Sequence, residues 1–392
     1  MIPHHQRLSI KDYLFVGGIW FSAFAGLLPE AINKVALYLV VPTLFLLTII
    51  SCRSLTSNKY MNLLTILFIW ILVSVLWATD INYAMVQIKQ ILGSFLLCFI
   101  FSQKAQHQKF LPWLYLSFIV LLIGDWYYAY NNMFDVMEFG VDRLNDNKLN
   151  ANTFGYHTFY ATFAIFVLGE WNLKYKRLFR ALFLIMIPLS FVTAMYTASR
   201  QILLIQIPLL ILLLYGRYFK SVRGSLKLMT LIVFLLVSLV LIPRVKSFYE
   251  GSSLQQRNEI EVKDDVRIQL MLDAFEVGNR NFPLGVGANN YILHSFNKHF
   301  SHNTYLELYA NEGIIGVLLY VIMLYLFLKT QWRRYRITKD MMFFYFFIAG
   351  IIFAFDGFFY VFYPHLWLIS FFILIAAHSE TYYKQYKYKL SI

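Results

Sequence analysis

Long apolar runs dominate this sequence and leave few folds open to it. We count about twelve, each close to the length that an α-helix needs to cross the hydrocarbon core of a bilayer. Inside lipid every backbone polar group needs an internal partner, which only helices or a closed barrel provide. The runs therefore predict an all-α polytopic membrane protein. They cover residues 13–29, 34–51, 61–79, 82–101, 110–130, 153–171, 178–197, 200–216, 227–243, 303–328, 341–358 and 362–379.

The basic residues are unevenly distributed between these runs. If the N-terminus is cytoplasmic, most of the 34 lysines and arginines fall on the cytoplasmic side, whereas the short outer loops near 30–33, 80–81 and 357–361 carry none. This is the positive-inside pattern, and it places both termini in the cytoplasm. The net charge of +13 is then a consequence of topology, so we expect no nucleic-acid partner.

Two outer loops are long, at about 131–152 and 244–302. Within the second, Asp265–Val277 carries two rows of apolar residues, which predicts an amphipathic helix on or near the bilayer surface. We find no internal repeat and no linker that would divide the chain. We therefore expect a single integral membrane domain over 1–392, in which the large loop 244–302 leads into a helix over 303–328.

The start of that helix combines polar residues with a long apolar run. Thr304 followed by Glu307 is typical of a capping box and predicts that the helix begins here. Gly313 and Gly316 would let another helix approach closely. His302 then lies at the membrane surface, where its imidazole could act as a general base. Taken alone, it could equally be an interfacial histidine with no role in chemistry.

Three other basic side chains are candidates for a functional role, and two of them stand between or within apolar runs. Arg200 stands at the outer end of two apolar runs and Lys89 lies within the run 82–101. A charge in such a place faces a polar cavity or a partner, or else it snorkels to the headgroups. Arg267 could simply pair with the neighbouring Asp264 or Asp265. The residues alone leave these alternatives open.

The segment Pro283-Leu284-Gly285-Val286-Gly287-Ala288-Asn289-Asn290, followed by His302-Asn303 and the residues up to Gly316, resembles the signature of the O-antigen ligase and polymerase superfamily. These are bacterial membrane glycosyltransferases of the GT-C type that use polyprenyl-diphosphate-linked glycans. The close match covers about residues 257–320, with a second patch around Arg200. The resemblance implies a GT-C-type fold with a long helical extracytoplasmic loop over an outward-facing cavity.

The resemblance also implies roles for individual residues. His302 would be the catalytic base. Arg200 and Arg267 would hold the diphosphate, because a guanidinium group binds phosphate oxygens in a planar, bidentate way. Lys89 would add positive charge at the same depth. Arg143 and Asn152 would contact the glycan or acceptor, although their loop could also be a solvated loop with no such role. Asn303, Glu307 and Glu312 would orient His302.

The implied reaction transfers a glycan from undecaprenyl diphosphate to a sugar hydroxyl on the extracytoplasmic side of the bacterial cytoplasmic (inner) membrane. In a polymerase the acceptor is another lipid-linked repeat unit, and in a ligase it is the lipid A-core. The sequence around His302, Ser-His-Asn-Thr-Tyr-Leu-Glu at 301–307, resembles the polymerases more than the ligases, so it favours the polymerase, with the ligase as the alternative. A flippase for lipid-linked glycans is a more distant alternative. No metal-binding motif occurs, so we expect neither metal nor cofactor.

The charge asymmetry makes a prediction about topology. Tags or accessible cysteines placed in 131–152 and 244–302 should report from outside the cytoplasm, and those in 217–226 and 329–340 from inside it. Labelling with a membrane-impermeant thiol reagent in intact and opened cells would measure this. A cytoplasmic position for the loop 244–302 would contradict both the topology and the chemistry built on it.

Overall fold

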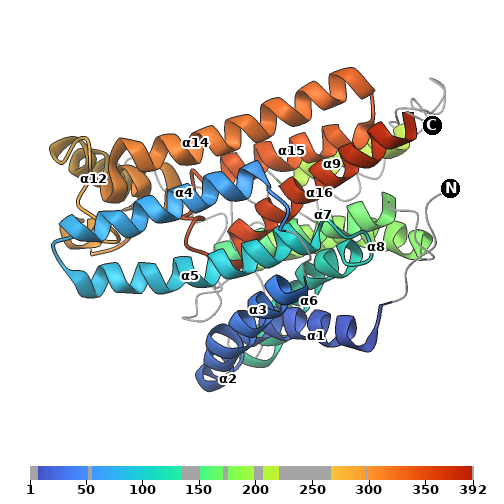
Figure 1. Cartoon of the computed structure of the whole chain (residues 1–392), viewed down its shortest axis with the longest axis horizontal. Coiled ribbons are helices and arrows are strands. Elements are labelled where there is room, and N and C mark those ends of the chain that lie inside the picture. Colours follow the sequence, from blue (N-terminus) through green and yellow to red (C-terminus); the bar gives the residue numbers. More distant parts are fainter. Residues whose placement is uncertain are drawn as a thin grey trace. The chain divides into compact units, whose positions relative to one another are not determined.

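A computed structural model of the chain describes residues 8–51, 55–133, 151–170, 175–197, 206–219, 266–295 and 298–390. Every regular element among these residues is a helix, and none is a strand, which confirms the all-α prediction (Figure 1). Seven of the helices are long and apolar enough to cross a membrane, and Met341–Asp356 is a shorter apolar helix. The predicted number of about twelve spans is not confirmed. The predicted segment 227–243 and the start of 200–216 lie outside the described residues.

Internal contacts divide the chain into two compact units, one of Met1–Val120 with Val262–Ile392 and the other of Leu121–Glu261. The expected single integral membrane domain stays a prediction. The first unit contains α1 (Ile10–Ala25), α2 (Glu30–Val35), a π-helical turn (Ala36–Val40), α3 (Val41–Ser51), α4 (Lys59–Ser74), α5 (Ile81–Lys104), α12 (Val266–Arg280), α13 (Tyr291–His294), α14 (Thr304–Thr338), α15 (Met341–Asp356) and α16 (Leu366–Leu390). The boundary between the units falls within α6 (Leu111–Met133), and the second unit contains α7 (Ala151–Glu170), α8 (Lys176–Thr197) and α9 (Ile207–Leu214).

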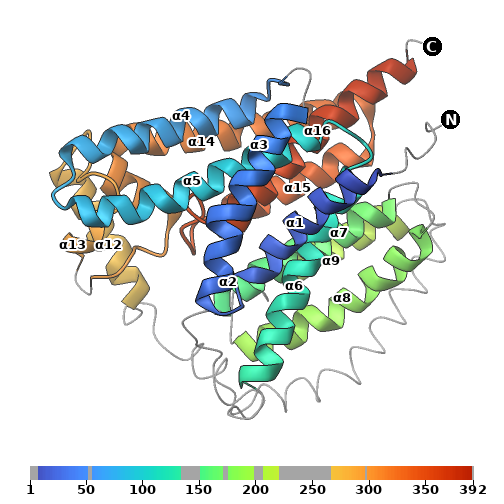
Figure 2. The ribbon, with the colours of Figure 1, turned by 60° about the horizontal axis from the view of Figure 1, so that its bottom comes forward.

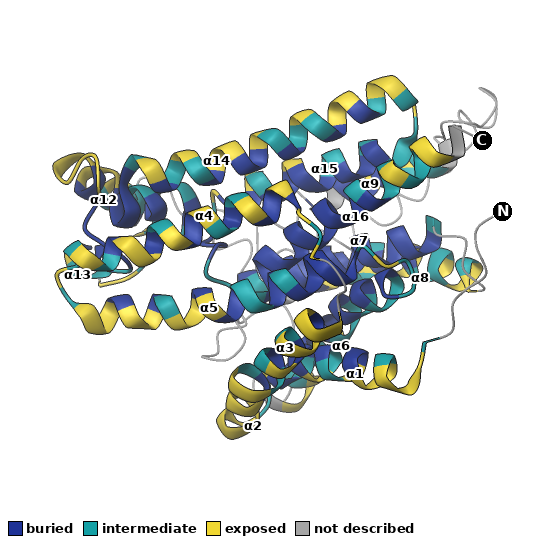
Figure 3. Ribbon diagram, in the orientation of Figure 1, coloured by how far each residue is buried: buried dark blue, intermediate teal, exposed yellow. Residues whose placement is uncertain are grey.

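The core of the first unit is built around α16. Every residue from Ile369 to Ala377 is fully buried, as expected of a helix that is apolar on all sides. Helices α4, α5 and α15 pack against it, and α14 packs against α4 and α15 (Figures 1 and 2). By contrast, α14 leaves one side exposed, with Leu318 and Tyr325 at least half accessible (Figure 3). An exposed apolar side on a candidate span is what contact with lipid requires.

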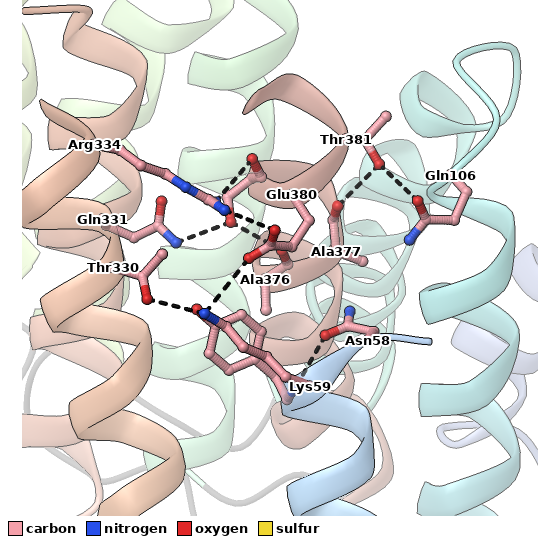
Figure 4. A network of polar contacts seen from close by, with 12 residues as sticks. Asn58, Lys59, Gln106, Thr330, Gln331, Arg334, Ala376, Ala377, Glu380 and Thr381 are labelled. Atoms are coloured by element: carbon pink, nitrogen blue, oxygen red, sulfur yellow. Dashed lines mark hydrogen bonds and ion pairs between the residues drawn. The ribbon is translucent and has the colours of Figure 1, made fainter. Parts of the chain in front are cut away.

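A polar network joins α4, α14 and α16 at the end of α14 far from Thr304 (Figure 4). Arg334 donates to Glu380 at 2.7 Å, and Gln331 donates to the Ser379 hydroxyl at 3.0 Å. Lys59 of α4 donates to a threonine hydroxyl of α14 at 3.1 Å. Because Arg334 is almost completely buried, its charge needs this carboxylate. The network fixes the relative positions of the three helices at the end that the charge pattern predicts to be cytoplasmic.

The second unit contains its own buried polar pair. Nδ1 of His157 on α7 lies 2.8 Å from a carboxylate oxygen of Asp125 on α6. At the other end of α7, Arg217 donates to the Gly169 carbonyl at 3.0 Å and pairs with Glu170 at 2.8 Å. Arg217 thus satisfies the Gly169 carbonyl, one of the last carbonyl groups of α7, which have no partner within the helix.

Candidate functional site

The helix α14 is interrupted at Gly313, whose backbone takes φ 68° and ψ −164°. The interruption leaves carbonyl groups in the preceding turn without their usual donors four residues on. The backbone N–H of Val286 donates to the Ala310 carbonyl at 2.9 Å, and that of Gly287 donates to the Asn311 carbonyl at 2.8 Å. The turn before α13 therefore binds into the break of α14 through its own backbone.

Two further hydrogen bonds satisfy backbone groups at the break of α14. The N–H of Ile314, which has lost its helical acceptor, donates to the Pro283 carbonyl at 3.1 Å. The indole N–H of Trp70 on α4 donates to the Glu312 carbonyl at 2.9 Å. Buried backbone groups that find no water must find protein partners, and this turn and α4 supply them.

Glycine is required on both sides of this contact. A Cβ atom on Gly313 would lie 1.9 Å from the Pro283 carbonyl oxygen, and one on Gly285 would lie 2.5 Å from the Asn311 carbonyl oxygen. Both glycines have positive φ angles, of 68° and 74°. The prediction that Gly313 admits a neighbouring helix is therefore wrong, because the segment that approaches it is the turn 283–287.

The side chain of Glu307 connects Ser301, the residue before His302, to Asn311 and through it to Tyr291 at the start of α13. One of its carboxylate oxygens accepts from the Ser301 N–H at 2.7 Å, and the other accepts from the Asn311 side-chain amide at 3.1 Å. The Asn311 amide oxygen in turn accepts from the N–H of Tyr291 at 2.7 Å. We call Glu307, Asn311 and the break at Gly313 the motif hub, because all three hold loop backbone in place.

The side chain of Tyr291 is hydrogen-bonded as well as its backbone. Its hydroxyl donates to the Leu270 carbonyl on α12 at 2.7 Å. Burial raises the pKa of this hydroxyl, and the nearby carboxylates of Glu307 and Asp273 raise it further. The hydroxyl therefore stays protonated and continues to donate. Through this tyrosine, α12 is tied to the motif hub.

Asn303 caps α14 at its N-terminus. Its side-chain oxygen accepts from the N–H groups of Tyr305 at 2.9 Å and Leu306 at 3.0 Å. The predicted start of the helix is confirmed, but the predicted capping box of Thr304 and Glu307 is wrong. The cap lies one residue earlier, and the Glu307 carboxylate is bound elsewhere.

The hydroxyl of Thr304 has a different use. It donates to the Tyr360 carbonyl at 2.6 Å and accepts from the Phe362 N–H at 3.0 Å. The Thr304 N–H donates to the Gly357 carbonyl at 2.7 Å. The first residue of α14 therefore holds the connection between α15 and α16.

The residues on both sides of His302 are held in place by hydrogen bonds. Ser301 before it binds Glu307, and Asn303 after it caps α14. Its own φ is 56°, which is uncommon for a residue with a side chain and recurs at functional sites. Its ring is partly buried and lies 4.2 Å from the Phe300 ring, centroid to centroid, and 6.0 Å from that of His299. The loop thus presents His302 in one defined backbone conformation.

Glu312 is fully buried, and sequence reasoning missed its partner. Gln87 on α5 donates to Glu312 at 3.3 Å and to the Tyr363 hydroxyl at 2.6 Å. The signal was available, since a polar amide inside an apolar run is costly without a partner. The sequence prediction had chosen Lys89 on the same helix, which the structure leaves exposed.

Apart from Lys89, the predicted site residues fall into four groups. The structure brings His302, Asn303, Glu307 and Glu312 together at the start of α14. Arg267 lies partly buried in the first turn of α12, which packs against α14. Asn152 is buried in the first turn of α7, in the other unit. Arg200 and Arg143 lie outside the described residues.

The part of the chain that the structure describes holds no group of three or more His, Cys, Asp or Glu side chains arranged to bind a metal. The buried carboxylate of Glu307 accepts from the Ser301 backbone N–H and from the Asn311 side-chain amide. Independence from metal stays a prediction.

Comparison with known proteins identifies one family. Residues 181–321 match the family described as O-antigen ligase. The match covers the turn 283–287, His302 and Gly313, which together form the site described above. It confirms the resemblance to the O-antigen ligase and polymerase superfamily. No curated protein matches the chain.

The contact at Gly313 makes a prediction about stability. Gly313→Ala should destabilise the protein by roughly 3 kcal/mol or more, since the new methyl group meets the Pro283 carbonyl and the backbone is strained. Gly17→Ala in α1 is the matched control, because a Cβ there meets nothing within 4 Å. It should leave stability unchanged or raise it by up to about 1 kcal/mol. Thermal unfolding in detergent would measure both, and equal midpoints would contradict the described contact.

Proposed function

Because the chain contains the O-antigen ligase family region at residues 181–321, we propose that it is a membrane glycosyltransferase of surface polysaccharide biosynthesis. The polymer would be an O-antigen, a capsule or an exopolysaccharide. The donor is a glycan on undecaprenyl diphosphate and the acceptor is a sugar hydroxyl. The reaction takes place on the periplasmic or outer side of the cytoplasmic membrane, with both termini of the chain in the cytoplasm.

In the proposed reaction His302 removes the proton from the acceptor hydroxyl. The oxygen attacks the anomeric carbon of the donor, a new glycosidic bond forms, and the bond from that carbon to the diphosphate breaks. Undecaprenyl diphosphate leaves with the bonding electron pair, and His302 keeps the proton until solvent takes it. A single displacement of this kind inverts the anomeric centre.

The observation that carries this proposal is the way His302 is held. A general base contributes most when its geometry is fixed before the acceptor arrives. Hydrogen bonds fix the residues on both sides of His302, and its backbone is in the left-handed region.

The resemblance to the O-antigen ligase and polymerase superfamily supports the remaining roles. Arg200 and Arg267 bind the diphosphate and stabilise the charge that develops on it, and Lys89 adds to the positive potential. Arg143 and Asn152 contact the glycan or the acceptor. Asn303, Glu307 and Glu312 orient His302 and the start of α14. The exposed side chain of Lys89 is equally consistent with snorkelling to the headgroups.

The acceptor separates two versions of this function. We favour the polymerase, in which the acceptor is another lipid-linked repeat unit, because the amino-acid sequence at 301–307 resembles that of the polymerases. The alternative is a ligase that transfers the glycan to the lipid A-core. A flippase is favoured less, because the polar residues concentrate at one motif and not in two related halves of the chain.

Substitution of His302 tests the chemistry. His302→Ala should lower the rate of transfer by ~10²–10⁴-fold while lipid-diphosphate binding stays largely intact, because a base acts in the transition state. His299→Ala, in the exposed neighbouring histidine, should leave the rate near that of the wild type. The assay is transfer to a defined acceptor by purified protein, with donor affinity measured separately. Wild-type rates in His302→Ala would refute the mechanism.

The two arginines should behave differently from His302. Arg200→Ala and Arg267→Ala should weaken both donor binding and transfer, since they contact the diphosphate before and during the reaction. Replacement by lysine should rescue only in part, because an ammonium group cannot bind two oxygens in a planar fork. Arg280→Ala, an exposed arginine of α12 paired with Glu276, is the control. If the wild type moves donor across vesicles without forming glycosidic bonds, the flippase replaces this proposal.

Chelation tests the expected independence from metal. Purified protein should transfer glycan at an unchanged rate in excess EDTA, because the proposed mechanism neutralises the leaving diphosphate with arginines. The rate of transfer before and after chelation measures this. Loss of activity that Mg²⁺ or Mn²⁺ restores would reveal a metal site that this mechanism lacks.

A further inference from the structure

Helix α12 has apolar residues on two opposite sides. On one side Leu270, Ala274 and Val277 are buried. Ala274 and Val277 belong to a cluster that includes Tyr291 and Ala310, so this side packs against α13 and α14. It accounts for one of the two apolar rows in the sequence. The other row points away from this cluster.

The second apolar side of α12 is exposed and carries large side chains. Leu272 is 63% exposed and Phe275 is 52% exposed. The turn that follows adds Phe282, which is 62% exposed, and Leu284, which is 41% exposed. We call these four residues the apolar ridge. Leu272 and Phe275 share their side of α12 with Asn279, whose amide oxygen accepts from the Tyr309 hydroxyl of α14. Several large apolar side chains exposed on one short segment mark an interaction surface.

Polar residues occupy the flank of α12 between its two apolar sides. At 100° per residue, Gln269, Glu276 and Arg280 fall within one narrow sector of the helix, and all three are exposed. Glu276 and Arg280 form an ion pair there. A helix with one protein-facing side, one apolar exposed side and one charged side has the distribution of an interfacial helix.

The ridge continues into the accessible side of a candidate membrane span. The carbonyl carbon of Leu284 lies 2.6 Å from the position that a Cβ of Gly313 would take. Just beyond that break, Ile315, Leu318 and Ile322 of α14 are exposed, at 37%, 50% and 42%. Helix α12 lies beside this end of α14 (Figures 1 and 3). The backbone of Leu284 thus lies against the break at Gly313, next to the point where the exposed row of α14 begins.

We propose that α12 is a membrane-embedded interfacial helix, with Leu272, Phe275, Phe282 and Leu284 inserted among the lipid acyl chains and the Glu276–Arg280 flank in the headgroup and water layer. The continuity of the ridge with the span selects lipid as the occupant. Because α12 is tied to the motif hub through Tyr291, its depth also sets the depth of the His302 loop. The proposal stands independently of the function proposed above.

Nitroxide spin labels on the full-length protein in vesicles of phosphatidylethanolamine and phosphatidylglycerol test this proposal. The background carries Cys52→Ser and Cys98→Ala, and single cysteines then replace Leu272, Phe275 or Phe282 on the ridge. Gln269→Cys and Glu276→Cys are the matched controls on the polar flank of the same helix, and Leu318→Cys on α14 reports the hydrocarbon environment. Collision rates with oxygen, which partitions into lipid, and with a water-soluble nickel chelate are compared at each position.

The expected result is that ridge labels resemble the Leu318 label, with the collision ratio shifted several-fold towards oxygen relative to the Glu276 label. Ridge labels that collide with the nickel chelate as often as the Glu276 label would overturn the proposal. Ridge labels that are immobile and shielded from both reagents would also overturn it, because protein, such as a second copy of the chain, would then cover the ridge. Each labelled variant is first shown to elute from size-exclusion chromatography as the unlabelled background does.

Discussion

The break of α14 at Gly313 is the constraint on which the rest of the motif depends. A helix that stops and restarts inside a protein exposes carbonyl and N–H groups that must be satisfied where they are buried. The turn 283–287 satisfies three of these groups and Trp70 a fourth. The same turn can approach only because Gly285 and Gly313 have no side chains. Backbone hydrogen bonding, and not side-chain packing alone, therefore determines where the loops around His302 lie.

The two ends of α14 are organised differently. The break at Gly313 divides its 35 residues, and the 25 residues at 314–338 alone span ~38 Å at 1.5 Å per residue, beyond the ~30 Å of hydrocarbon in a bilayer. At one end Arg334 and Glu380 fasten it to α16 with a part-buried ion pair. At the other end Glu307 and Asn311 hold loop backbone through their side chains. The helix after Gly313 is anchored at its far end, and the hydrogen bonds across the break connect it to the motif, which gives the site a fixed support.

Apolar runs predicted the helices, because length and hydropathy alone decide whether a helix can span lipid. The start of α14 was predicted correctly, but its cap was assigned to Thr304. The sequence pattern cannot show that the Thr304 hydroxyl is hydrogen-bonded to the Tyr360 carbonyl and the Phe362 N–H instead. Gly313 was recognised as a place of close approach, but the neighbour was taken for a helix. Gln87 was overlooked in favour of the charged Lys89, because its role depends on Glu312 and Tyr363, which are more than 200 residues away in sequence.

The central claim is that the interrupted helix holds the loops around His302 by hydrogen bonds, and amide hydrogen exchange of the wild-type protein tests it most directly. The informative amides are those of Val286, Gly287, Tyr291, Ser301 and Ile314. If the claim holds, all five exchange as slowly as amides inside α14, although four of them lie outside any long helix. Exchange at the rate of amides in an unstructured peptide would contradict it.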